Sequence, residues 1–216
     1  MKIPVLSDIQ RDSLKEIASI GVSHAATALS KMINKKVLID VPQINIVPID
    51  DLSKEIEPSE ELMVGIYLRV IGKVSGKVLL TFKKESALLL TDVLLKKKAG
   101  ETKILAEMEQ SALKELGAIS TAVCLNAVAD LLKITLLPSI PHFTYDRTNS
   151  IVKELFDEVK SDYKYLVVVD SVFKESNNHI LGKFLLFPDE EAFTAIFNAL
   201  QLQTLIQDKH ALKYKK

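Results

Sequence analysis

The sequence predicts an α+β fold: an internally duplicated pseudo-twofold domain, with a mainly antiparallel sheet and two long helices on one face. The first observation is a repeat, because LKEIASIGVSHAATALSKMI at 14–33 returns 99 residues later as LKELGAISTAVCLNAVADLL at 113–132. The second is that each copy precedes short extended segments, a hairpin pattern and a further helix. Only two copies exist, so we expect a duplicated domain rather than a solenoid, which needs three or more repeats.

The amino-acid composition, the charge balance and the cysteine count favour a soluble, cytoplasmic protein. Hydrophobic residues make up 48% and charged residues 26%, a globular composition. The 28 basic residues balance the 28 acidic ones, so we expect no nucleic-acid partner. Cys124 alone cannot form an internal disulfide, and neither a signal peptide nor an uncharged apolar span of about 18 residues is apparent, so we expect no membrane insertion.

We expect one domain over residues 1–216. The repeat halves cover about 7–100 and about 106–201, and a polar C-terminal tail covers about 202–216. The halves carry the same succession of predicted elements, so a boundary between independent domains is not expected where they meet.

The first half begins with a helix. The capping-box pattern at 7–10 predicts its start, and helical apolar spacing continues to about Ile33. Gly21 in the middle of the helix predicts close packing or a bend, because glycine costs about 1 kcal/mol there relative to alanine. Residues 35–49 predict two short strands separated by Pro42, which cannot donate to a ladder.

The remainder of the first half predicts a hairpin and a helix. The stretch 50–61 is polar and is interpreted as a connection. Alternating apolar residues at 61–72 and 76–83 predict two strands joined by a tight turn. An amphipathic helix over 85–99 is expected to end at Gly100, a favourable residue after a helix.

The second half repeats this order. A long helix is predicted from near Met108 to about Lys133, and 134–141 is short and extended. Residues 146–162 are predicted to be helical, and a second hairpin turns at about Glu175 to Asn178. A last helix is predicted after Pro188, because three acidic residues would stand in its first turn.

The repeat places polar side chains on matching stripes of the two long helices. The first stripe consists of Asp12, Glu16 and Ser19, which fall within about 60° of one another at 100° per residue. The corresponding positions of the second copy are Ser111, Glu115 and Ala118. A single glutamate on an amphipathic helix is usually just solvated. Two equivalent glutamates are more informative, although duplication alone can preserve them, so the stripes leave both interpretations open.

The two copies read Asp12-x3-Glu16-x2-Ser19-x22-Pro42 and Ser111-x3-Glu115-x2-Ala118-x22-Pro141. This spacing resembles the Asp/Ser-x3-Glu-x2-Asn-x22-Pro signature of the CheC/CheX/FliY phosphatases of bacterial and archaeal chemotaxis. The resemblance covers essentially the whole chain and is closest to CheC, because the motif occurs twice.

The resemblance implies a function. The substrate would be the phosphorylated response regulator CheY, and the receptor deamidase CheD would be a further partner. Glu16 and Glu115 would reach the receiver's active-site lysine, with Asp12, Ser111 and Ala118 in the docking stripes. An asparagine would hold a water in line with the aspartyl phosphate, and Mg²⁺ would sit on the receiver, so we expect no cofactor on this chain.

This sequence departs from the pattern at the asparagine, which is Ser19 in the first copy and Ala118 in the second. Serine is shorter and bonds back to its own helix, and alanine cannot hydrogen-bond through its side chain. We therefore expect a catalytically silent protein that binds a receiver or CheD. The alternative is a weak aspartyl-phosphate phosphatase acting through Glu16 and Ser19. Ser23 and His24 are possible substitutes for the asparagine, although His24 falls about 140° round the helix from Ser19.

Other signals point to structure rather than chemistry. The four histidines lack metal-ligand spacing, so no metal site is expected. Cys124, among apolar neighbours, is interpreted as a buried small side chain. The lysines at 96–98 are interpreted as solvated.

Overall fold

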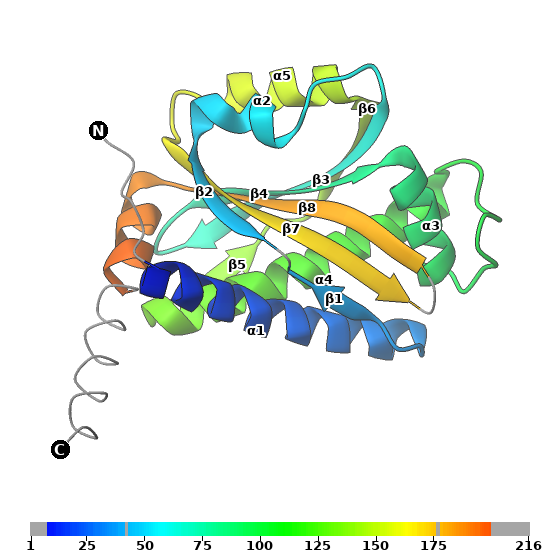
Figure 1. Cartoon of the computed structure of the whole chain (residues 1–216), viewed down its shortest axis with the longest axis horizontal. Helices are drawn as coiled ribbons and strands as arrows, with labels where there is room; N and C mark the ends of the chain where they lie inside the picture. The colour runs from blue at the N-terminus through cyan, green and yellow to red at the C-terminus, as the bar shows by residue number, and fades with distance from the viewer. Residues whose placement is uncertain (1–7, 42, 176–177, 200–216) are drawn as a thin grey trace.

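The computed structural model describes residues 8–41, 43–175 and 178–199 (Figure 1). The elements of the first half are α1 (Asp8–Ile33), β1 (Leu38–Asp40), β2 (Ile44–Pro48), the 3-10 turn η1 (Ile49–Asp51), α2 (Leu52–Glu55), β3 (Leu62–Gly72), β4 (Gly76–Lys83) and α3 (Lys84–Leu94). The elements of the second half are α4 (Glu107–Leu132), β5 (Leu136–Pro138), β6 (His142–Arg147), α5 (Thr148–Val159), β7 (Tyr165–Glu175), β8 (Asn178–Pro188) and a helical stretch at 190–199.

The sheet confirms the predicted duplication. Its strands follow the order β1-β7-β8-β4-β3-β5, with β2 also paired to β7 and β6 to β3. When each strand is replaced by its counterpart in the other half, the result is the same strand order read from the opposite edge. A pseudo-twofold axis therefore passes between β4 and β8. All pairings are antiparallel. The long helices match as well, since α1 and α4 each have 26 residues.

The two halves exchange strands. The first two strands of the first half, β1 and β2, pair with β7 of the second half. In return, β5 and β6 of the second half pair with β3 of the first. A half on its own would therefore leave a long edge of unpaired backbone groups, which supports the expectation that the halves form one folding unit.

Helices cover both faces of the sheet (Figure 1). On one face α1 and α4 pack side by side, and the core beneath them includes Leu29, Leu116 and Ile66. On the other face α2 and α5 close a second core around Leu52, Leu155 and Phe187. The prediction of two long helices on one face is confirmed, whereas the cover on the opposite face was not predicted.

Pro141 of the second copy stands where the register of the sheet slips, whereas Pro42 lies outside the described residues. Between Asp40 and Ile44 the chain advances four residues, while the paired β7 advances three. Between Pro138 and His142 it again advances four residues against three on β3. The second break is a one-residue bulge, and Pro141 lies within it. The unpaired residue of a bulge has no ladder bond to lose, so the missing N–H of proline is tolerated there.

Three local predictions were wrong. Residues 49–55 are helical rather than a polar connection, because Leu52 is fully buried in the second core. Helix α3 ends at Leu94, where the chain turns through Lys96 in the left-handed conformation (φ 59°) instead of at Gly100. Strand β6 was missed and takes the first two residues of the predicted helix at 146–162, since its mostly exposed side chains give no apolar period.

The connection between the halves is anchored by Asp92. This buried carboxylate accepts hydrogen bonds from the backbone N–H groups of Gly100 (2.7 Å) and Thr102 (2.8 Å). Lys97 is not solvated as we expected, because its Nζ lies 2.8 Å from Oε1 of Glu109 in the first turn of α4. The connection that leads into α4 is therefore held in place by three polar contacts, one of which reaches the helix itself.

Two glycines test the packing of the long helices. A Cβ at Gly117 would lie 2.5 Å from Cγ2 of the buried Ile66, whereas one at Gly21 would meet α4 at 3.6 Å. We expect Gly117→Ala to lower the free energy of unfolding by about 1–3 kcal/mol through overpacking. Gly21→Ala should leave it unchanged or raise it by up to about 1 kcal/mol through helix propensity. Chemical denaturation measures both, and equal effects would contradict the close approach of α4 to β3.

Asp92 predicts an acid-sensitive anchor. Burial acts to raise the pKa of Asp92, but the hydrogen bonds from Thr102 and Gly100 outweigh it and leave the pKa below the ordinary value of 3.8. Its stabilisation is therefore full above pH 3.8 and is lost as the pH falls through the lower folded-state pKa. Asp92→Asn should cost about 1–3 kcal/mol near neutral pH, because an amide cannot accept both bonds equally well.

Unfolding curves at several pH values check this, with Asp130→Asn, an exposed carboxylate of α4, as the control. The stability gap between the wild-type chain and Asp92→Asn should shrink below about pH 3.8. A gap that stays constant down to the acid transition would show that the carboxylate is not the anchor.

Candidate functional site

The first predicted stripe lies on the solvent side of α1. Asp12, Glu16 and Ser19 all have exposed side chains. The opposite side of α1 carries Gly21 and Ala25, both of which are buried. The amphipathic pattern that predicted the stripe therefore also orients it.

The second stripe lies on the solvent side of α4. Ser111 and Glu115 are exposed, while Ala118 is half-buried. Leu113 and Leu116 are fully buried beneath the helix and fix its rotation about its own axis. Glu115 is thus presented to solvent much as Glu16 is on α1.

The fold keeps the two stripes apart. Helices α1 and α4 run in opposite directions (Figure 1), and Gly21 of α1 lies against Cys124 of α4. Glu16 precedes this contact by five residues and Glu115 by nine, so at 1.5 Å per residue the two carboxylates lie about 20 Å apart along the helix axes. They form two separate sites on one surface rather than a single composite site.

Neither possible substitute for the missing asparagine is well placed. The Ser23 hydroxyl donates to the carbonyl of Ser19 (2.8 Å), so it is engaged within the helix. His24 is exposed, and its position on the helix turns it away from the stripe. Ser19 is therefore the remaining hydroxyl of the stripe itself, and the second copy has only the methyl group of Ala118.

The sequence did not single out two exposed apolar side chains near the second stripe. Ile104 is 72% exposed and Met108 is 66% exposed, just before and within the first turn of α4. Met108 precedes Ser111 by three residues and Glu115 by seven, so it lies on the same face of the helix. This spacing was readable from the sequence, but the exposure depends on how the helix packs. The second stripe thus offers an apolar contact beside its carboxylate.

Over the described ranges, no group of three or more His, Cys, Asp and Glu side chains is placed to hold a metal ion. The expected Mg²⁺ belongs to the receiver and stays a prediction.

Helix α4 is apolar enough, by length and composition alone, to cross a membrane. Here it packs against α1 and the sheet, and Leu113, Leu116 and Leu125 are buried in the main core. The core helix of a soluble protein has the same composition, and we interpret α4 in this way.

Known proteins are similar to this chain in sequence and in fold. Residues 9–46, which include the first stripe, match the model of the CheC-like family. The protein named CheY-P phosphatase CheC, from Bacillus subtilis (strain 168), is 29% identical over 199 residues, covering 90% of this chain and 95% of that protein. The structure of Thermotoga maritima FliY superposes with a TM-score of 0.70 at 19% identity, covering 91% of this chain and 98% of that one.

These likenesses agree with the duplicated helices, the antiparallel sheet and the twofold motif. The relative from Bacillus subtilis is matched over nearly its whole length, so the agreement is not confined to one helix. In sequence and in fold, this chain is similar to CheC-like proteins of the CheC/CheX/FliY group.

Proposed function

We propose that this chain is a cytoplasmic chemotaxis regulator that docks on phosphorylated CheY-type receivers through Glu16 and Glu115. The supporting observation is that both glutamates are exposed at equivalent positions of two helices held in one layer. A carboxylate in this position can form a charge-assisted hydrogen bond with a receiver lysine. Relatives named for CheY-P support the choice of partner.

We propose that docking persists while catalysis is weak or lost. Hydrolysis of an aspartyl phosphate requires a water oxygen to attack phosphorus in line while the bond to the carboxylate oxygen breaks. The side chain of Ser19 is one bond shorter than that of asparagine, and a misplacement of about 1 Å can cost on the order of 10²-fold in rate. Ala118 has no side-chain atom that can hold the water.

A weak phosphatase acting through the first stripe is the second candidate. It is favoured by the exposure of Ser19 beside Glu16, since a hydroxyl can still hydrogen-bond to a water. Mg²⁺ on the receiver would neutralise the developing charge in either case. The receptor deamidase CheD is a proposed additional partner, on the basis of the resemblance, and its binding is measured alongside that of the receiver.

Docking is tested by titrating the chain with a receiver activated by beryllofluoride, a stable mimic of the aspartyl phosphate. Replacing both glutamates (Glu16→Ala with Glu115→Ala) should weaken binding at least about tenfold, because a charge-assisted hydrogen bond contributes about 1.5–3 kcal/mol. Each single variant should have a smaller effect, since the two stripes are separate. The same titration with CheD shows whether the stripes serve that partner too.

The control is Glu154→Ala, which removes an equally exposed carboxylate from α5 on the opposite face. It should bind the receiver as the unaltered chain does. Unchanged binding in the double glutamate variant would overturn the proposed docking surface.

Restoring the asparagine tests the account of catalysis. Ser19→Asn should accelerate phosphate release from phosphorylated CheY on the order of 10- to 100-fold, because the amide regains the reach needed to hold the water. Ser23→Asn, one helical turn further from Glu16, should give no gain. Rapid release by the unaltered chain that survives Ser19→Ala would instead show that another group places the water.

A further inference from the structure

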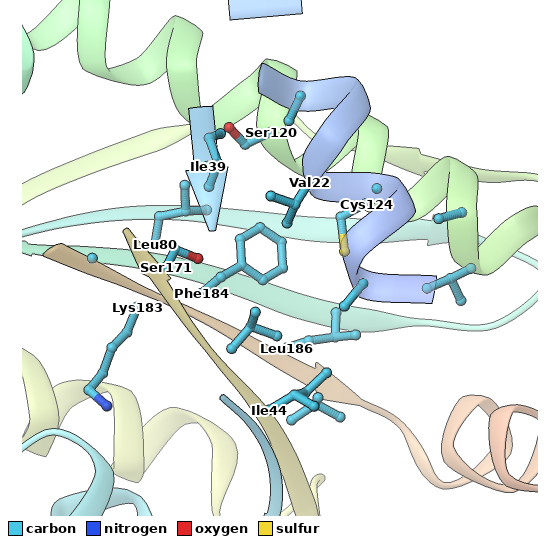
Figure 2. Close-up of a pocket in the computed structure, with 18 of the residues that line it drawn as sticks. Val22, Ile39, Ile44, Leu80, Ser120, Cys124, Ser171, Lys183, Phe184 and Leu186 are labelled. Carbon is cyan, nitrogen blue, oxygen red and sulfur yellow. The ribbon is translucent and has the colours of Figure 1, made fainter. Parts of the chain in front are cut away.

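An apolar cavity of about 90 Å³ lies between the α1–α4 pair and the sheet (Figure 2). The helices line it with small side chains, such as Ala18, Gly21 and Ala127. The strands line it with larger apolar ones, such as Leu80, Phe184 and Leu186. Because the small helix residues cannot fill the space above the strands, the layer retains a void that could hold several non-hydrogen atoms.

One polar group in the lining has no partner. Ser120 of α4 is 9% exposed, and its hydroxyl finds no hydrogen-bond partner in the described part of the chain. A buried hydroxyl without a partner costs about 1–3 kcal/mol, so it is rarely retained without a reason. A water needs two to four polar partners, and the mostly apolar lining provides too few to hold one well.

The charged side chain that lines the cavity is already paired, so the lining offers no partner to an ionic ligand. Lys183 contributes to the lining, but Figure 2 shows its side chain extending away from the apolar cluster. Its ammonium group pairs with Asp170 at 2.7 Å. Burial also raises the pKa of the Cys124 thiol to about 12, so this thiol of the lining stays neutral.

We propose that the cavity is a binding site for a neutral, mostly apolar molecule of short-chain-alcohol size, whose single hydroxyl or carbonyl group hydrogen-bonds to Ser120. The apolar walls would hold the hydrocarbon part, and the serine would orient the polar end. The proposal does not rest on receiver docking, since the docking stripes face solvent on the other side of the helices.

The test uses 1-butanol as the probe, with butyrate and butylammonium as charged molecules of the same chain length. Ligand-observed NMR on the full chain should detect 1-butanol, with a dissociation constant on the order of 1 mM, and should detect neither ion. Val22→Phe, which replaces an isopropyl group of the lining with a phenyl ring, should abolish the NMR signal of bound 1-butanol. Equal binding of butyrate, or no binding of 1-butanol, would overturn the proposal.

A matched pair of variants keeps the test decisive even if Val22→Phe does not fold. Ser120→Ala and Thr121→Val each remove a buried hydroxyl that lacks a partner among the described residues, but only Ser120 lines the cavity. Ser120→Ala should weaken 1-butanol binding about three- to tenfold. Thr121→Val should leave it unchanged, and equal effects of the two variants would refute the role of Ser120.

Discussion

The antiparallel pairing of β4 with β8 joins the two hairpins and carries the pseudo-twofold axis of the molecule. The exchange of strands around it makes each half complete the sheet of the other. Asp189 strengthens the same junction, because one carboxylate oxygen accepts from Ser75 in the β3–β4 turn and the other caps the helical stretch at 190–199. The two copies of the repeat therefore share one continuous sheet.

This symmetry decides what the duplicated motif can do. A twofold axis relates α1 to α4, so the helices run in opposite directions and their equivalent stripes point to separate places on the same surface. With about 20 Å between them along the helix axes, Glu16 and Glu115 cannot contact the same small group. Ser19 and Ala118 therefore stand at two separate places on this surface, and neither side chain can act in place of the other.

The two copies have also become unequal. The second stripe has exposed apolar side chains beside it. The beginning of its helix, α4, is anchored through Asp92 and the Lys97–Glu109 pair. The same helix contributes Gly117 to the close contact with β3 and Ser120 to the cavity beneath the layer. One 26-residue helix thus combines the exposed second stripe, a tight packing contact and part of the cavity lining. These features are compatible because they occupy different sides and turns of the helix.

Local periodicity determined a large part of this protein. The repeat and its apolar spacing were sufficient for the long helices, both hairpins and the rotation that exposes Glu16 and Glu115, because each depends on residues close in the chain. The sequence alone also placed a serine at position 19 and an alanine at position 118 of the two stripes. Tertiary structure decided the rest: the short helix containing Leu52, the edge strand β6, the left-handed turn at Lys96 and the distance between the stripes. Each of these depends on contacts between residues far apart in the sequence, such as the burial of Leu52 against α5, and no local pattern records which distant element will be the partner.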